Sequence, residues 1–327
     1  MNVLVCGGAG YIGSHMVKML SDSGHHVVTF DNLSTGHRNS VKWGTLVEGD
    51  LLNSDDLDVV FSKHPFDAVI HFAARSLVGE SEQNPELYYR NNVVGTMNLL
   101  DAMHRHGVDR IIFSSTAAVY GNPETDTISE NHPKNPINVY GKSKLMVESI
   151  LNDYSNAYGI SSVCLRYFNA AGADPEGMTG ERHEPETHLI PNIIRSLLRS
   201  GDAELKVFGN DYDTADGTCV RDYIHVNDLC SAHLLAAGYL AGHEGAFTFN
   251  LGNGTGFSVM QILRAVEEVA KQAVEFEIQD RRKGDPAVLV ADARLAQLEL
   301  GWEPQYSDIS DIIRTAWNWH TKRNVNE

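Results

Sequence analysis

Short apolar runs alternate with longer segments in which apolar residues recur every three or four positions along the first half of the chain. Nearly all-apolar runs predict buried strands, and the longer periodic segments predict amphipathic helices. We expect strands at 3–6, 26–30, 45–48, 68–72, 110–114 and 162–165, and helices at about 12–22, 54–63, 85–106 and 138–158. Because strands and helices alternate, the pattern predicts βαβ units and a doubly wound parallel sheet with helices on both faces.

The pattern changes after about residue 166. The stretch 169–188 is long, polar and rich in Gly and Pro, which is typical of a functional or mobile loop. Beyond it we expect short strands at 205–208, 246–251 and 288–291 among helices at 188–199, 226–240, 258–272 and 309–320. The sequence therefore predicts an α/β chain with a first domain over residues 1–168, to which part of 218–250 returns, and a smaller mixed α/β C-terminal lobe over 169–327.

Charge narrows the classes of ligand. The chain of 327 residues has 26 basic against 43 acidic residues, which gives a formal net charge of −17. A surface that binds nucleic acid or an anionic membrane needs clustered Lys and Arg, so we expect no nucleic-acid partner and no membrane partner. A small anionic substrate is compatible with this charge, because it needs only a local pocket of Arg.

Cysteine usage indicates a reducing compartment. The four cysteines form no Cys-x-x-Cys pair and have no zinc-site spacing, so we expect reduced thiols. The first residues, MNVLVCGGAG, lack a charged n-region, and no stretch approaches the roughly 20 apolar residues of a membrane span. The sequence predicts a soluble, cytoplasmic protein.

A glycine-rich turn follows the first predicted strand and opens the first predicted helix. Gly7, Gly10 and Gly13 have the spacing G-x-x-G-x-x-G. Glycines at such a turn let backbone N–H groups approach a pyrophosphate at the positive end of a helix, as in a Rossmann-type dinucleotide-binding domain. The alternative is a glycine-rich turn that only caps a core helix.

Asp31 ends the second predicted strand, 18 residues after Gly13. A carboxylate at about this distance (roughly 20 residues) binds the adenosine ribose hydroxyls and repels a 2′-phosphate. No Arg or Lys occurs from 32 to 37, so NAD is favoured over NADP as the cofactor. The alternative is that Asp31 only caps the strand end.

Three hydroxyl residues, Ser114, Ser115 and Thr116, follow the strand at 110–114, where ligands bind in a doubly wound sheet. Tyr140 and Lys144 come on the next predicted helix, four residues apart and therefore on one face. A phenol with a pKa near 10 is a poor base at neutral pH, and a neighbouring ammonium would lower that pKa. Spacing alone leaves open a solvated Tyr–Lys pair.

The glycine turn, Asp31, the Ser-Ser-Thr strand end and Tyr140-x-x-x-Lys144 together resemble the extended short-chain dehydrogenase/reductase superfamily. Within it, the chain resembles the UDP-glucose 4-epimerase family. The stretches that carry this resemblance run from residue 1 to about 302 and include GGAGYIGSH, DNLSTGHR, FSSTAAVYG, YGKSKLMVE, LRYFNAAGA, GTCVRDYIHV and RRKGDPA.

This resemblance implies an isomerase that interconverts UDP-glucose and UDP-galactose at C4. Tightly held NAD accepts hydride from C4 of the hexose while Tyr140 takes the proton of the 4-hydroxyl. The transient 4-keto sugar then turns and receives hydride on its other face, so no external reductant is consumed. The implied catalytic residues are Tyr140, Lys144, Thr116 and Ser115, with Lys144 at the nicotinamide ribose.

The resemblance also implies the binding residues. The first domain binds the cofactor, through Gly7, Gly10, Tyr11, Ile12, Gly13, Asp31, Asn32, Asp50, Leu51, Phe72, Ala73, Ala74, Asn91, Ser114, Tyr140, Lys144, Tyr167 and Phe168. The C-terminal lobe mainly binds the UDP-hexose, through Thr116, Tyr140, Asn169, His188, Leu189, Phe208, Arg221, Arg282, Asp285 and Leu289. Two of these have plain alternatives: Arg221 could pair with Asp222, and Arg282 lies in a segment that alone reads as a solvated turn.

The sequence departs from the family pattern at a few positions. Ser76 stands where a Lys contacts the cofactor phosphates, and Arg75 is a candidate replacement. Thr116 replaces a Ser and keeps the hydroxyl, and His188 stands where an Asn often contacts the substrate phosphate. Leu289 stands where some members carry a large aromatic, so activity on UDP-N-acetylglucosamine is an alternative, in addition or instead.

Three other kinds of function are alternatives to an epimerase: a dehydratase, an NAD sensor and a metal-dependent enzyme. A nucleotide-sugar 4,6-dehydratase needs an Asp-Glu pair where this chain has Ala117 and Ala118, which disfavours it. A non-catalytic NAD-sensing protein usually lacks Tyr140 or Lys144. HEPETH at 183–188 has histidines five apart without a helical H-E-x-x-H, so we expect no metal. We expect a homodimer, with the helices at 85–106 and 138–158 as the shared face.

Overall fold

The computed structural model describes residues 1–198, 205–282 and 285–324. Its larger sheet has seven strands in the order β11-β7-β5-β4-β1-β2-β3, and all neighbours are parallel. The strands are β1 (Asn2–Cys6), β2 (His26–Asp31), β3 (Thr45–Glu48), β4 (Ala68–His71), β5 (Arg110–Ser114), β7 (Ser161–Tyr167) and β11 (Ala246–Leu251). The predicted doubly wound parallel sheet is confirmed.

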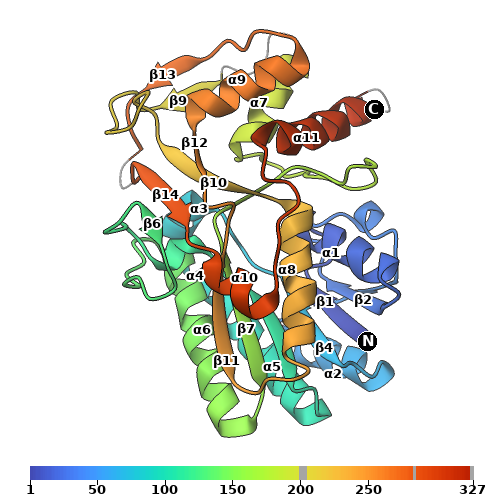
Figure 1. Ribbon diagram of the computed structural model, residues 1–327. Coiled ribbons are helices and arrows are strands. Elements are labelled where there is room, and N and C mark those ends of the chain that lie inside the picture. Colours follow the sequence, from blue (N-terminus) through green and yellow to red (C-terminus); the bar gives the residue numbers. More distant parts are fainter. Residues whose placement is uncertain (199–204, 283–284, 325–327) are drawn as a thin grey trace.

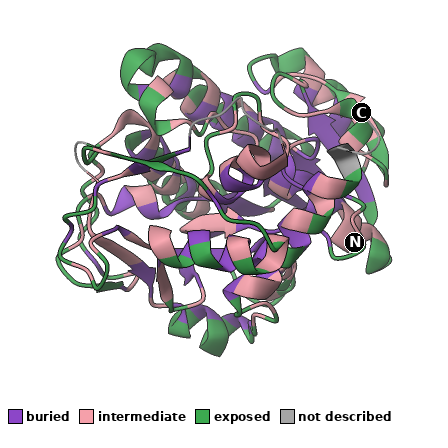
Figure 2. Cartoon of the chain, turned by 90° about the horizontal axis from the view of Figure 1, so that it is seen from above, coloured by how far each residue is buried: buried purple, intermediate pink, exposed green. Residues whose placement is uncertain are grey.

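Helices cover both faces of this sheet (Figure 1). Successive residues of a strand point to opposite faces, so Val3 and Val5 of β1 lie in one core cluster while Leu4 and Cys6 lie in the other. The first cluster also holds residues of α1 (Tyr11–Asp22) and α8 (Val226–Tyr239). The second holds residues of α2 (Ser54–Lys63), α5 (Gly95–His106) and α6 (Val139–Tyr158). Figure 2 shows the buried residues gathered in the interior.

The predicted single helix at 85–106 is wrong in its middle. The segment consists of α4 (Pro85–Tyr88), the π-helical η2 (Tyr89–Val94) and α5. The Thr96 hydroxyl donates to the Asn92 carbonyl at 2.6 Å. A side chain therefore bonds a carbonyl that accepts only from a backbone amide in a regular helix. A wider turn of this kind often occurs beside a functional site, and Asn92 is buried and donates to the Ser143 hydroxyl of α6.

The remaining elements gather near the carboxyl ends of the large sheet (Figure 1). A second sheet has the order β12-β10-β14-β6, with β8 also paired to β10, and a two-stranded sheet joins β13 to β9. These strands are β6 (Thr127–Ile128), β8 (Asn169–Ala171), β9 (Lys206–Phe208), β10 (Val220–His225), β12 (Gly256–Ser258), β13 (Glu277–Gln279) and β14 (Val288–Ala291). Sequence periodicity missed β6, β8, β10, β12 and β13, because strands of two to six residues carry too little pattern.

The C-terminal helices surround a third core cluster. They are α7 (Leu189–Leu198), α9 (Val259–Ala270) and α11 (Ile309–Asn324), while α10 (Arg294–Leu300) packs on the first cluster. The shorter helices are α3 (Val78–Gln83), η1 (Arg38–Ser40) and η3 (Ala117–Val119). Residue 199 of the predicted helix 188–199 lies outside the described residues. Within the described ranges, no helix has both the length and the apolar character needed to cross a membrane.

Candidate active site

The strand order of the large sheet reverses between β1 and β4, and ligands of open α/β sheets bind outside the carboxyl ends of strands at such a point. Five of the predicted site residues lie at or directly after five strand ends. They are Gly7 after β1, Asp31 in β2, Phe72 after β4, Ser114 in β5 and Tyr167 in β7. Residues far apart in the sequence therefore share one edge of the sheet.

The glycine turn needs glycine for steric reasons. Gly7 has φ +79°, and a Cβ there would lie 2.6 Å from the Ala73 nitrogen. A Cβ on Gly13 would lie 2.1 Å from the Gly7 carbonyl oxygen. Gly10 is the N-cap of α1, and no described side chain caps this helix end. A Cβ on Gly10 would meet only the Gly7 oxygen, at 3.4 Å, so open space lies beside the helix start.

Asp31 joins the second strand to the glycine turn. One carboxylate oxygen accepts from the Ala9 amide at 2.9 Å, and the other accepts from the Leu33 amide at 2.8 Å. Burial raises the pKa of Asp31, and these two backbone hydrogen bonds oppose the rise. Each oxygen keeps acceptor capacity for a ribose hydroxyl. Asp31 thus caps its strand end and also fixes the turn.

Three further residues predicted to bind the cofactor, Asn32, Asp50 and Leu51, follow Asp31 in the chain. Asn32 donates to the Asp50 carboxylate at 3.0 Å, and Asp50 also accepts from the Leu52 amide. Leu51 belongs to the second core cluster and is buried. The N–H groups of Phe72 and Ala73 both donate to the Cys6 carbonyl, which holds the segment before Ala74 against the turn.

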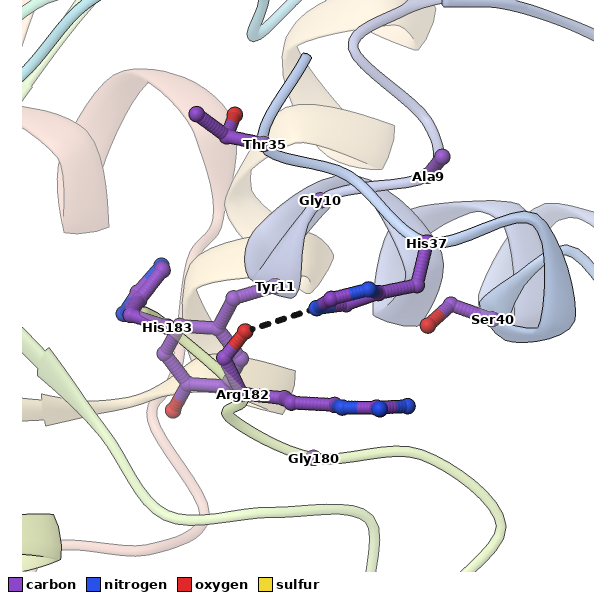
Figure 3. Close-up of a pocket in the computed structure, with 9 residues that line it drawn as sticks. All are labelled: Ala9, Gly10, Tyr11, Thr35, His37, Ser40, Gly180, Arg182 and His183. Atoms are coloured by element: carbon purple, nitrogen blue, oxygen red, sulfur yellow. Dashed lines mark hydrogen bonds between the residues drawn. The ribbon is translucent and has the colours of Figure 1, made fainter. Parts of the chain in front are cut away.

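A small pocket lies between the glycine turn and the 169–188 segment (Figure 3). His37 bonds the Arg182 carbonyl across it at 3.1 Å, and the Tyr11 hydroxyl donates to the Gly172 carbonyl at 2.6 Å. The long polar segment is therefore held against the cofactor-binding turn. The pocket is lined by Ala9, Gly10, Tyr11, Thr35, His37, Ser40, Gly180, Arg182 and His183.

The reactive residues meet at the end of β5. A hydrogen bond joins the Thr116 and Tyr140 side chains, and Thr116 also accepts from the Ala118 amide at 3.1 Å. Lys144, one turn after Tyr140 on α6, donates to the Ser114 carbonyl at 2.8 Å. Asn138 caps α6 by accepting from the Gly141 amide at 2.8 Å, which fixes the turn that carries Tyr140.

Burial dominates the pKa values of this pair. It raises the pKa of Tyr140 to about 12, while the bond from Thr116 acts in the opposite direction. It lowers the pKa of Lys144 to about 7. The expected lowering of the phenol pKa by the ammonium is therefore not produced by the protein groups alone, because desolvation disfavours both charged forms.

The two serines before Thr116 have different partners. The Ser114 and Tyr167 hydroxyls are 2.5 Å apart. The fully buried Ser115 hydroxyl instead donates to Glu148 at 2.6 Å, and Glu148 forms a buried ion pair with Arg166. Ser115 therefore lies in a structural network, not with Thr116 and Tyr140, because neighbouring residues of an extended chain point in opposite directions.

The predicted uridine-diphosphate residues form two groups. Arg221 of β10 pairs with Asp285, so the alternative pairing with Asp222 is wrong. The guanidinium of Arg282, an exposed residue, lies 4.1 Å from the centre of the Phe208 ring, which is a cation–π contact. Such forked donors suit a diphosphate in a chain of this negative charge.

The other residues predicted to bind the substrate lie on β8, on β14 and at the start of α7. The Asn169 amide donates to the Asp222 carbonyl at 3.1 Å. Leu289 packs with Phe168 on a small cluster that includes Ala117. His188 contacts Glu181 and directly precedes Leu189, the first residue of α7.

Comparisons with known proteins agree with this geometry. Residues 3–252 match the model of the NAD dependent epimerase/dehydratase family. The chain belongs to this family. It is 50% identical over 323 residues to the UDP-glucose 4-epimerase of Rhizobium meliloti, which covers 99% of this chain and 98% of that protein.

Two solved structures of UDP-glucose 4-epimerases are also similar. The Brucella ovis enzyme in complex with NAD has a TM-score of 0.94 and 49% identity and covers 97% of both chains. The Bifidobacterium longum enzyme in complex with NAD+ and UDP has a TM-score of 0.93 and 39% identity and covers 98% of both chains. The NAD cofactor expected for a member of this family fits the open space at Gly10 and the acceptor atoms of Asp31.

Some supporting residues of this family member escaped the sequence prediction. Buried Asn92, next to the predicted Asn91, bonds both backbone groups of Arg75 and the Ser143 hydroxyl of α6. The Ser81 hydroxyl accepts from the Tyr140 amide at 3.2 Å. A buried amide gives no periodic signal, so only the fold identifies these residues.

Proposed function

We propose that this chain catalyses the reversible epimerisation of UDP-glucose and UDP-galactose at C4, with tightly bound NAD. The observation that carries the proposal is the contact of Thr116 with Tyr140 one turn from Lys144, at the strand ends beside the glycine turn. The similar proteins named UDP-glucose 4-epimerase support it.

NAD, when bound, supplies the hydride acceptor and donor of the two half-reactions. Gly7, Gly10 and Gly13 hold its pyrophosphate, and Asp31 holds its adenosine ribose. Of the other predicted cofactor residues, Tyr11 and Ile12 lie at the start of α1, and Asn91 lies in η2. Ser114 and Tyr167, whose hydroxyls are 2.5 Å apart, bound the nicotinamide side.

Tyr140 exchanges the proton of the sugar 4-hydroxyl. As that hydroxyl becomes a carbonyl, its proton would pass to the phenolate form of Tyr140, and the resulting phenol would return it when the 4-keto sugar is reduced. Thr116 bonds the Tyr140 side chain and orients the sugar hydroxyl against it. Lys144 is fixed by the Ser114 carbonyl and adds positive charge that favours the phenolate when protonated.

The C-terminal lobe holds the nucleotide. Arg221 and Arg282 bind the diphosphate, with Asp285 and Phe208 positioning the two guanidinium groups. Asn169, Leu189 and the Nε2 atom of His188 complete this side, while the Nδ1 atom of His188 contacts Glu181. The proposed division is a cofactor domain over 1–168 with elements from 218–250 returning to it, and a substrate lobe mainly over 169–327. Strand β11 is an edge strand of the large sheet and helix α8 packs on that sheet, while β10 belongs to the second sheet.

A 4,6-dehydratase is disfavoured by the residues after Thr116. Ala117 and Ala118 form the start of η3 and have no acid or base group for elimination of water. A protein that only senses NAD is disfavoured because Tyr140 and Lys144 are both present and positioned for proton exchange.

UDP-N-acetylglucosamine is the second candidate substrate. Leu289 packs beside Phe168 and Ala117, and this branched side chain occupies less volume than an aromatic ring. A direct assay with UDP-N-acetylglucosamine tests this candidate, and Leu289→Tyr should reduce that activity more than the activity on UDP-galactose.

We also propose a homodimer and a cytoplasmic location. Large apolar side chains are exposed on α4, η2, α5 and α6: Leu87, Val94, Met97, Met146 and Tyr158. A second copy of the chain could cover these side chains. All four cysteines, Cys6, Cys164, Cys219 and Cys230, are buried free thiols, as in proteins of a reducing compartment. Sedimentation analysis of wild type and Met97→Asp tests the dimer.

The activity itself is tested with purified protein and UDP-galactose. UDP-glucose should form without an added reductant, and added NAD should restore any activity lost with the cofactor. Absence of conversion in the presence of NAD, by a folded protein that still binds UDP, would refute the proposal.

A further inference from the structure

Four side chains with metal-ligand chemistry converge in the polar segment before α7. One ligand-type atom from each of Glu181, His183, Glu186 and His188 lies within 4.8 Å of the other three. The His183 Nδ1 atom is 3.0 Å from the Glu181 carboxylate and 3.6 Å from the Glu186 carboxylate, and His188 Nδ1 contacts Glu181. We propose that these residues bind one divalent cation of the zinc class, which locks the 181–188 segment in place.

The spacing suits a tetrahedral ion. With ligand bonds of about 2.0–2.1 Å, a tetrahedral ion keeps its ligand atoms about 3.4 Å apart, and the two His183 distances lie on either side of this value. Two imidazoles with two carboxylates favour Zn²⁺ over Mg²⁺ or Ca²⁺, which prefer oxygen ligands alone.

The carboxylates are prepared for a positive partner. The Glu186 oxygen that lies 3.6 Å from His183 Nδ1 also accepts from the Thr187 and His188 amides at 3.0 and 3.1 Å, which fixes the orientation of the carboxylate. The other oxygen is buried and has no hydrogen-bond partner among the described residues. The Arg195 guanidinium approaches that oxygen only to 3.7 Å. The Glu181 and Glu186 side chains are 4% and 1% exposed, and buried carboxylates require compensation.

The segment connects three parts of the molecule. The Arg182 carbonyl accepts from His37 beside the glycine turn (Figure 3), and the Glu181 carbonyl accepts from Trp319 of α11 at 3.1 Å. The His183 carbonyl accepts from Arg195 of α7 at 3.2 Å. A cation inside this segment would therefore order the connection between the cofactor turn and the helices of the C-terminal lobe. Its role is structural, and no step of the epimerisation uses it.

This arrangement differs from the sequence expectation of no metal. That expectation compared only the spacing of His183 and His188 with a helical zinc motif. The proposed ligands are instead the two histidines together with Glu181, which precedes them, and Glu186, which lies between them in the sequence. Chain reversal brings Glu181 and His188, seven residues apart, into contact.

Zinc binding can be measured independently of epimerase activity. The purified full-length protein is treated with a chelator, and its affinity for Zn²⁺ is measured by competition with a chromophoric chelator. We expect one tight site per chain, and Co²⁺ in its place should give the visible absorption of a four-coordinate ion. His183→Ala should weaken zinc binding by about tenfold or more. His104→Ala removes an exposed histidine of α5 and serves as the matched control.

Glu186→Gln is a second variant in case His183→Ala does not fold, because it keeps the size of the side chain and removes only its charge. It should also lose affinity, and zinc should raise the melting temperature of wild type more than that of Glu186→Gln. Absence of stoichiometric binding by the wild type overturns the proposal. Equal affinity of wild type and both cluster variants also overturns it, because the bound ion would then lie elsewhere.

Discussion

Tyr140→Phe is the sharpest perturbation of the proposed chemistry. The change removes one oxygen atom from a partly buried side chain and leaves the ring in place. If the Tyr140 oxygen exchanges the substrate proton, the loss of a general acid–base group should lower kcat by about 10²–10⁴-fold. This range corresponds to about 2.7–5.5 kcal/mol of activation free energy.

The same change should have a much smaller effect on folding. Tyr140 loses one side-chain hydrogen bond, to Thr116, and a hydrogen bond is worth about 0.5–1.5 kcal/mol of folding free energy. Thr116 keeps its bond from the Ala118 amide, so its oxygen is not left without a partner. The predicted loss of catalysis therefore exceeds the predicted loss of stability.

The assay measures conversion of UDP-galactose, binding of UDP and urea unfolding for the same preparations. Tyr154→Phe is the matched control, because Tyr154 lies on the same helix and its hydroxyl donates to Asp101 at 2.6 Å, outside the site. We expect Tyr140→Phe to bind UDP normally and to lose nearly all turnover, while Tyr154→Phe keeps its turnover. Wild-type turnover by Tyr140→Phe would remove Tyr140 as the proton-exchanging group.

Three further predictions concern groups around the site. The pKa of Lys144 is about 7 in the folded chain against 10.5 ordinarily, so the unfolded chain binds more protons between these values. As pH rises from 7 to 9, the free energy of unfolding of wild type should therefore increase relative to that of Lys144→Met, by up to about 1.4 kcal/mol per pH unit in urea unfolding. The same pH dependence of stability in both proteins would contradict the lowered pKa of Lys144. Arg166→Met leaves Glu148 buried without its ion-pair partner and should cost about 3–5 kcal/mol in the same assay, whereas the double change to Met at both positions should recover part of the loss. Gly13→Ala places a Cβ 2.1 Å from the Gly7 oxygen and should reduce the amount of bound NAD seen in the absorbance spectrum. Gly238→Ala has open space around its Cβ and should keep its NAD. Retention of NAD by Gly13→Ala would contradict the steric requirement for glycine in the turn.

Much of the cofactor side could be predicted from the sequence. Strands β3, β5, β11 and β14 and helix α2 have the predicted bounds, because each is a continuous apolar run or a regular amphipathic period. Each of three cofactor positions needs one residue type for a local reason. Gly7 has a positive φ, Gly13 lies close to another backbone segment, and Asp31 places a carboxylate at a strand end. Requirements of this kind depend on the residue and its immediate neighbours, so sequence spacing reveals them.

The partners of side chains could not be predicted in the same way. Ser115 follows Ser114 directly, yet its hydroxyl belongs to the Glu148–Arg166 network. Arg221 reaches Asp285, 64 residues away, instead of the adjacent Asp222. Neighbouring residues of a strand point to opposite sides, so adjacency in the sequence says little about which charges meet.

The sequence by itself determined the parallel sheet and the glycine turn, and it indicated the residues that we propose for proton exchange, because periodicity and short motifs are local properties of the chain. Tertiary structure alone decided the π-helical segment at 89–94, the burial that raises the Tyr140 pKa, and the convergence of Glu181, His183, Glu186 and His188. These features depend on which surfaces exclude water and on how loops fold back. Contacts of that kind form between distant segments and leave no regular pattern in the sequence.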